Sequence, residues 1–312
     1  MKLLFISVLL IVSINVFPQG CSDAGFCTMG ALKPDQHFEK KVQFKLRSME
    51  LNFYRGTTTA TPVIYMVISD FNFSFNAKSS LQFKVPYTFV QNGNLGETQG
   101  IGDVSLCYTR SLMTTDHFDL NFSFGSKIPT NRSDLTSNKF PGEPLPMYYQ
   151  TSLGTLDLMT GISLVNKKWL IATGIQVPIL HINRNGFDGS DFQEYPDPEY
   201  LTNYSPSNLV RRGIDVMFRV ERNIHFSRLN FSIGLLPIYR ITNDRITDEN
   251  GKEVKPHGAN GLALSEMITV GYHFNVRSGI KLIWPTKLVT REVNPDGLTR
   301  PAVFCVIYNY RF

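Results

Sequence analysis

Apolar and polar side chains alternate along most of this chain, which is the pattern of antiparallel β-strands with one apolar face. The clearest stretches are Phe71–Phe75, Leu81–Phe89 and Phe118–Phe124, where every second residue is aromatic or aliphatic. Other alternating segments lie at residues 42–46, 104–108, 156–164, 169–179, 214–220, 229–233, 264–274, 280–284 and 302–312. Together these segments predict an all-β protein of about 12 strands.

The links between the predicted strands alternate between short and long. Short links lie at residues 76–79, 113–116, 166–168 and near 275, and long polar links lie at 91–100, 130–150, 183–209, 242–261 and 289–300. Outer-membrane barrels have short periplasmic turns and longer extracellular loops. A soluble β-sandwich has no reason to segregate its long loops in this way. We therefore predict a transmembrane antiparallel up-and-down β-barrel of about 12 strands, with both chain ends on the periplasmic side.

Both ends of the chain agree with an outer-membrane location. Residues 1–20 contain an early lysine, then a short apolar run, then polar residues, which is the pattern of a cleaved signal peptide. The apolar run is too short for a membrane-spanning helix, which needs roughly 20 residues. The last strand carries Tyr308, Tyr310 and Phe312 on one face. It resembles the closing strand of bacterial outer-membrane barrels, which implies that these three residues are a signal for insertion by the outer-membrane assembly machinery.

Residues 21–36 precede the predicted barrel at 37–312 and lack alternation. They contain Cys21 and Cys27, which form a predicted local disulfide because the protein is exported. Two interpretations remain open for this segment: a disordered periplasmic leader, or a compact plug inside the barrel mouth. Cys107 and Cys305 lie within predicted strands and are expected to be small packed side chains.

Composition narrows the class of protein further. The 23 Phe and 13 Tyr residues suit a barrel in which only half of each strand faces lipid. The net charge of +5 is mild and its basic residues are dispersed, so no nucleic-acid partner is expected. The expected partners are the lipid bilayer, the assembly machinery and small hydrophobic solutes, and the oligomeric state stays open.

Strand alternation also assigns side chains to the lumen. If Val104, Leu106 and Tyr108 face lipid, their neighbours face inward. The same phase along the other strands predicts these lumen-lining residues: Lys84, Asp103, Asp119, Asn121, Asp157, Asp215, Arg219, Asn230 and Arg240. They either pair to hold the barrel rigid or line a channel. Side chains alone can fill the interior of an 8-stranded barrel, whereas a barrel of about 12 strands is wider inside. This favours a narrow lumen or a ligand cavity, unless residues 21–36 and the loops fill it.

Catalytic, metal and cofactor sites are not expected. His225 and Ser227 have the spacing of a nucleophile and its base, but they lie at a predicted turn. The acidic residues between 188 and 199 do not have the spacing of a calcium loop. The glycines between 93 and 102 form no phosphate-binding loop, because no helix follows them.

Three stretches carry a family resemblance: Gly100–Leu112, Phe124–Thr130 and Gln150–Leu164. They are similar to a Gly-hydrophobic-Gly-Asp strand opening, a strand ending in hydrophobic-Pro-Thr, and a Gly-Thr-x-Asp strand. In this order they resemble the outer-membrane proteins of the meta-pathway phenol-degradation family, which are related to the long-chain fatty-acid outer-membrane transporters. The resemblance implies passage of small hydrophobic compounds. The cysteine pair and the fewer strands depart from the fatty-acid transporters and argue against a fatty-acid substrate.

The sequence therefore predicts a Gram-negative outer-membrane channel or transporter, not an enzyme, for the passive passage of small, partly hydrophobic molecules. The alternative is a non-transporting barrel that displays its long loops for adhesion or structure.

Overall fold

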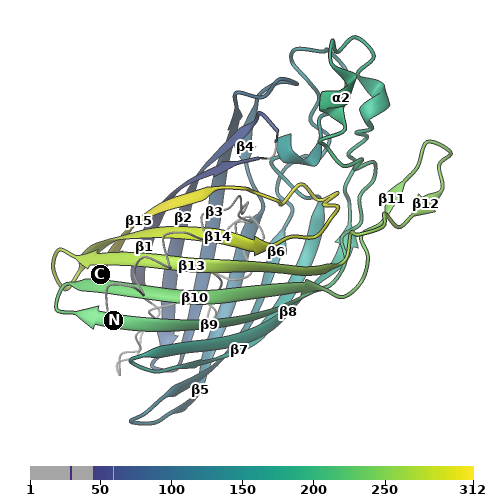
Figure 1. Cartoon of the computed structure of the whole chain (residues 1–312). Helices are drawn as coiled ribbons and strands as arrows, with labels where there is room; N and C mark the ends of the chain where they lie inside the picture. The colour runs from purple at the N-terminus through teal and green to yellow at the C-terminus, as the bar shows by residue number, and fades with distance from the viewer. Residues whose placement is uncertain (1–28, 30–44, 59) are drawn as a thin grey trace, which may run out of the picture.

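The computed structural model describes residues 29, 45–58 and 60–312, which form an antiparallel β-barrel (Figure 1). Twelve strands make up the wall: β1 (Lys45–Thr57), β2 (Val63–Asn76), β3 (Ser79–Gln91), β5 (Val104–Thr114), β6 (Asp119–Ile128), β7 (Thr155–Val165), β8 (Trp169–His181), β9 (Asp215–Phe226), β10 (Leu229–Arg240), β13 (Gly261–His273), β14 (Ser278–Val289) and β15 (Val303–Arg311). β1 pairs with β15, so the sheet closes on itself. The predicted fold class is confirmed.

The first two strands extend well beyond the predicted segments. β1 continues to Thr57, past the predicted end at residue 46, and β2 begins at Val63, before the predicted start at residue 71. The reason is visible in β2, where Ile64 and Met66 are buried inside the barrel while their neighbours face outward. Because both faces of this part of the strand are apolar, the alternation that reveals the other strands is hidden.

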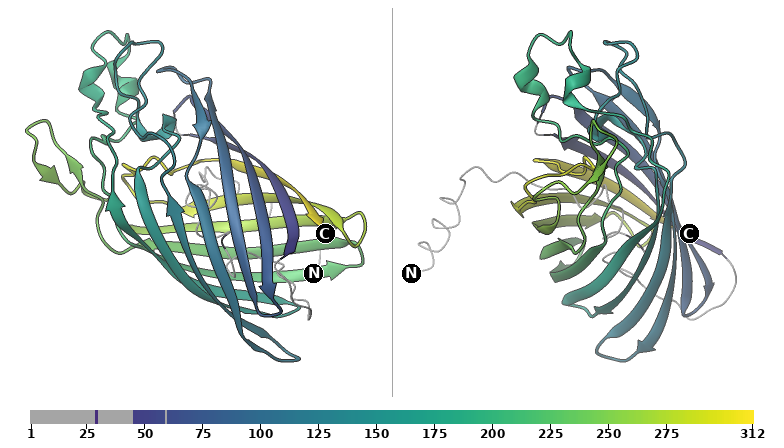
Figure 2. Two further views of the ribbon diagram at one scale, coloured as in Figure 1. Left: turned by 180° about the vertical axis from the view of Figure 1, so that it is seen from behind. Right: turned by 90° about the vertical axis from the view of Figure 1, so that its right-hand side faces the viewer.

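The short turns between strands lie at one end of the barrel, and the long links lie at the other end (Figures 1 and 2). The long links carry the small elements β4 (Thr98–Ile101), η3 (Met147–Tyr149), η4 (Gly189–Asp191), α2 (Pro198–Leu201), β11 (Ile246–Thr247) and β12 (Glu253–Val254). An aromatic core that includes Tyr149, Phe187, Phe192 and Tyr204 holds several of these links together. In the usual orientation of such barrels, the end with the long links is extracellular.

The outer surface of the barrel is apolar at alternate positions of each strand. Exposed side chains include Phe53, Phe124, Ile162, Phe218 and Trp284, each more than 40% accessible. In water so many exposed large apolar groups would cause aggregation, whereas in a bilayer they meet hydrocarbon. At the end with the short turns, aromatic side chains lie where a bilayer interface is expected: Trp169, Phe226, Tyr272, Phe274 and Phe312.

Among the described residues, no helix has the length and apolar character needed to cross a membrane.

Candidate functional site within the barrel

The structure places the nine predicted lumen residues as follows. Asp103, Asn121, Asp157, Asp215, Arg219 and Arg240 are buried, and Lys84, Asp119 and Asn230 are partly buried. The outward phase predicted for β5 agrees with the accessibility pattern, since Leu106 is exposed while Ser105 and Cys107 are buried. Three of the nine residues, Asp157, Asp215 and Arg240, come together in one cluster.

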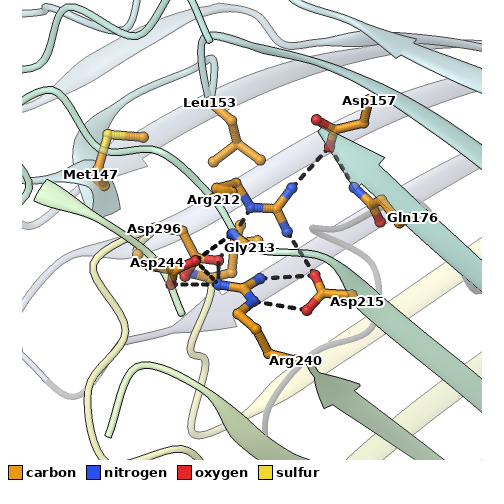
Figure 3. Close-up of polar contacts among 12 residues, drawn as sticks. Met147, Leu153, Asp157, Gln176, Arg212, Gly213, Asp215, Arg240, Asp244 and Asp296 are labelled. Atoms are coloured by element: carbon orange, nitrogen blue, oxygen red, sulfur yellow. Dashed lines mark hydrogen bonds and ion pairs between the residues drawn. The ribbon is translucent and has the colours of Figure 1, made fainter. Parts of the chain in front are cut away.

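This cluster, which we call the arginine–aspartate network, lies where strands of the wall and several long links meet (Figure 3). Its members, all buried, are Asp157, Arg212, Asp215, Arg240, Asp244, Arg291 and Asp296. They come from β7, β9, β10 and three long links, so residues far apart in sequence meet at one point. Three guanidinium groups face four carboxylates.

Arg240, the last residue of β10, is the centre of the network. Its Nε and Nη2 atoms donate to the two carboxylate oxygens of Asp215, both at 2.8 Å. Its Nη1 atom donates to Asp244 Oδ1 at 2.7 Å and to Asp296 Oδ2 at 2.9 Å. Bidentate pairs of this kind are the strongest ion pairs in proteins and fix the planes of both groups. Arg240 therefore joins the barrel wall to two links.

Arg212, in the link before β9, connects the network to β7, which lies two strands away from β9 in the wall. It donates to Asp157 Oδ2 of β7 at 2.9 Å, to Asp215 Oδ2 at 3.2 Å and to Asp296 Oδ2 at 3.3 Å. Gln176 of β8 donates to the same oxygen of Asp157. Asp157 Oδ2 thus accepts from two partners, which offsets part of the cost of burying the charge of this carboxylate.

Arg291 fixes the link between β14 and β15 from the other direction. Its Nη1 atom donates to the carbonyl of Ala259 at 2.9 Å and lies 3.2 Å from Asp244 Oδ2, while its Nη2 atom lies 3.5 Å from Asp296 Oδ1. The link 290–302 and the link 241–260 are consequently tied to each other as well as to the strands. The network holds the outer loops folded over the barrel.

The two loop carboxylates of the network have opposite pKa shifts. Burial raises the pKa of Asp244, and the adjacent carboxylate of Asp296 adds to the rise, although Arg240 opposes it. Burial alone would also raise the pKa of Asp296, but Arg240, Arg291 and Arg212 outweigh that effect and hold its pKa well below the ordinary value. Asp296 is therefore the ionised anchor, and Asp244 is the group that takes up a proton first.

These shifts predict a pH dependence. Because the pKa of Asp244 is higher in the folded than in the unfolded chain, its protonation stabilises the fold as pH falls from 7 towards its ordinary value of about 4. Asp244→Asn should abolish this increment, whereas Asp296→Asn should lower the free energy of unfolding throughout the range. Urea unfolding in lipid vesicles at several pH values measures both. An unchanged pH profile in the Asp244→Asn protein would contradict the assignment.

Smaller ion pairs lie elsewhere in the interior. Arg219 pairs with Glu221 of the same strand at 2.5 Å. Lys84 Nζ lies 3.7 Å from Asp70 Oδ2, and Lys127 Nζ lies 3.6 Å from Asp103 Oδ2. The interior is therefore polar at several levels, and its charges are arranged in pairs.

An apolar band lies beside these charged groups. Its buried side chains are Met29, Cys107, Met159, Leu170, Ala172, Met217, Leu236 and Met267. Seven of them come from the wall, whereas Met29 belongs to the segment that precedes β1 and is only 2% accessible. Cys107 and Cys305 are both buried among the side chains of the barrel, as the sequence predicted.

The three stretches that carry the family resemblance meet at one place. Asp103 Oδ2 accepts a hydrogen bond from the Leu153 backbone amide at 3.1 Å, and Thr130 Oγ1 donates to the Gly102 carbonyl at 2.6 Å. A Cβ atom at Gly102 would lie 3.0 Å from Pro86 Cγ and 3.3 Å from the Thr151 carbonyl oxygen. Glycine is therefore suited to this position, where β4 gives way to β5 and the link before β7 approaches closely.

The histidine considered as a catalytic base has other partners. His225 contacts Asn230 through Nδ1 and the Lys167 carbonyl through Nε2. Ser227 occupies the turn between β9 and β10, with a φ of 48°. No group of three or more His, Cys, Asp or Glu side chains suited to a metal ion occurs in the part of the chain that the structure describes.

A closed antiparallel barrel with an apolar outer belt and a charged interior is the fold of an outer-membrane β-barrel. In particular, the chain is similar to an outer membrane channel from Pseudomonas putida F1, with a TM-score of 0.61 and 12% identity over 89% of this chain and 99% of that one. At this identity the similarity establishes the fold alone.

Other barrels are less similar. The translocator domain of the autotransporter NalP from Neisseria meningitidis has a TM-score of 0.42 and 7% identity, with 86% of this chain and 87% of that one covered. The outer membrane phospholipase A from Escherichia coli has a TM-score of 0.40 and 10% identity, with 86% and 94% covered. No family model matches the sequence, and no curated protein matches it.

Sequence reasoning missed four members of the arginine–aspartate network: Arg212, Asp244, Arg291 and Asp296. They lie in long links, where no periodicity assigns a side chain to either face. Cys21 and Cys27, the signal peptide and most of the segment 21–36 lie outside the described residues.

Proposed function

We propose that this protein is an outer-membrane channel for the passive passage of small, partly hydrophobic molecules. The observation that carries the proposal is the mixed interior, in which the apolar band lies beside paired charges. A solute with an apolar body and a polar group finds partners of both kinds on such a path. The resemblance to the phenol-degradation family supports the same class of solute.

We also propose that residues 21–36 plug the lumen. The support is Met29, whose side chain is buried within the apolar band of the wall. A segment held there narrows the passage without contributing hydrogen bonds between wall strands, because the wall strands pair with one another. The fold alone does not distinguish this channel from a barrel that only displays its loops, so a transport measurement is needed.

Liposome swelling tests both proposals. Vesicles containing the full-length protein should swell in isosmotic leucine faster than empty vesicles, and the ratio of leucine to serine rates should exceed that of a wide water-filled porin. Deleting residues 21–36 should raise the rates of both solutes. If neither protein exceeds empty vesicles, the barrel does not transport such solutes, and the role in display is favoured. Equal rates for the full-length and truncated proteins would reject the plug alone.

A further inference from the structure

The end of the barrel with the short turns carries mostly positive charge. The turns lie at residues 77–78, 115–118, 166–168, 227–228 and 274–277. Their basic residues are all exposed: Lys78, Lys167, Lys168, Arg228 and Arg277. Within these turns the sequence has one acidic residue, Asp116. In the usual orientation of such barrels this end lies at the periplasmic leaflet of the bilayer, so the turns form a basic collar at that surface.

One arginine beside this collar lies on the lipid-facing side of the wall. Phe218 and Ile224 of β9 are exposed on the outer surface, and Arg222 has the same phase along the strand. Its partners in register are Trp169 of β8 and Ile233 of β10, which are 41% and 40% accessible. Arg222 is thus surrounded by large apolar side chains that face the bilayer.

The guanidinium group of Arg222 lies over the indole ring of Trp169, with its Cζ atom 4.8 Å from the ring centroid. This distance is within the roughly 6 Å of a cation–π contact, which holds the side chain at this place on the wall. Among residues 45–58 and 60–312, no carboxylate forms an ion pair with Arg222. A positive charge on the lipid face without a carboxylate partner is explained if a lipid supplies the negative charge.

The turn at residues 166–168 brings two more cations close to this pair. It directly precedes Trp169, and the backbone amide of Asn223, the residue after Arg222, donates to the Lys168 carbonyl at 2.7 Å. Lys167 and Lys168 are both exposed. A phosphate group accepts paired hydrogen bonds from a guanidinium group and is also bound by ammonium groups. The donors required for a phosphate are therefore gathered beside one indole ring.

We propose that Arg222, Trp169 and Lys168 bind the headgroup of an anionic phospholipid in the periplasmic leaflet, with its acyl chains against the apolar outer face of β8, β9 and β10. Tryptophan is enriched at the level of the lipid headgroups, where the phosphates lie. A soluble anionic partner would have to displace lipid from this face, which favours the lipid. The site is on the outside of the wall, so the inference is independent of transport through the lumen.

The chain has two tryptophans, and one of them lies in the proposed site. In the Trp284→Phe protein, Trp169 is the single fluorescent reporter of the site. In the Trp169→Phe protein, Trp284 reports on the lipid face of β14, three strands away from β9. Each full-length barrel is reconstituted in phosphatidylcholine vesicles that contain brominated phosphatidylglycerol or brominated phosphatidylcholine with matched acyl chains. Bromine quenches a nearby tryptophan, so the two quenching curves give the relative affinity for the anionic lipid.

Quenching of Trp169 should show a roughly tenfold preference for phosphatidylglycerol, because each basic residue close to anionic headgroups contributes up to about fivefold in affinity. Trp284 should show no preference. Equal quenching of Trp169 by the two lipids, or the same preference at both tryptophans, would overturn the proposal.

Substitutions in the Trp284→Phe protein locate the binding. Arg222→Gln should lower the preference at Trp169 about fivefold. The matched control is Arg110→Gln, because Arg110 is an exposed, lipid-facing arginine of β5, four strands away from β9. It should leave the preference unchanged. An equal loss in the two variants would show that the overall charge of the barrel attracts the lipid, and the proposal would fail.

A second variant keeps the test decisive if Arg222→Gln does not assemble, as judged by heat-modifiability. Lys168→Gln changes an exposed turn residue and should also lower the preference, by up to about fivefold. An unchanged preference in this variant would remove Lys168 from the site. A preference at Trp169 in vesicles that do not swell supports the lipid site and leaves only the channel proposal rejected.

Discussion

Arg240→Met is expected to lower the free energy of unfolding by about 3–5 kcal/mol, the range for removing one partner from a buried ion pair. The substitution leaves Asp215, Asp244 and Asp296 buried with two guanidinium groups in place of three. The link 290–302 should detach from the wall, and protease should cut it in intact vesicles. Urea unfolding and limited proteolysis measure the two effects.

Arg245→Met is the matched control for this prediction. Arg245 is five residues further along the chain and also forms an ion pair, with Glu253 at 2.8 Å, but about half of its side chain is exposed. Exposed pairs contribute about 0–1 kcal/mol. Similar losses in the two variants would mean that the arginine–aspartate network does not hold the outer loops.

Phe124→Arg is expected to cost about 2–4 kcal/mol, the cost of a cation on the lipid face near the bilayer midplane. Phe124 lies in the middle of β6 with 48% of its side chain exposed. Reversible folding into phospholipid vesicles, followed by tryptophan fluorescence, gives the difference in free energy.

The same change at the end of a strand should be much milder. Phe226 is even more exposed, at 62%, but it is the last residue of β9 and lies next to a short turn. Near the interface the cost falls to about 0–1 kcal/mol. If Phe226→Arg proved as costly as Phe124→Arg, the depth assigned to these positions in the bilayer would be wrong.

Most of the wall could be predicted from the sequence because the bilayer imposes a strict rule on alternate residues. In β6, the outward Phe122 and Phe124 and the inward Asn121 and Ser123 follow it. The rule failed at β2, where Ile64 and Met66 face the interior and pack in the hydrophobic core under the outer loops. The exception thus occurs where side chains from the long links fill the interior.

The arginine–aspartate network could be predicted only in part. Alternation identified Asp157, Asp215 and Arg240 because they lie on strands. Asp244 and Asp296 lie in two different links, 52 positions apart in the chain. They join the network only because the folded links bring them to the same arginines. Only the three-dimensional arrangement of the loops supplies that information.

The network also makes the packing of the outer loops depend on the last hairpin of the barrel. Asp157, Arg212, Asp215, Arg240 and Asp244 all precede β13. Asp296 and Arg291 lie between β14 and β15, and β15 is the strand that closes the ring with β1. Without this hairpin in place, Arg212 and Arg240 lack the carboxylate of Asp296 that they share. The hairpin that closes the wall therefore also completes the ion pairs that hold the outer loops.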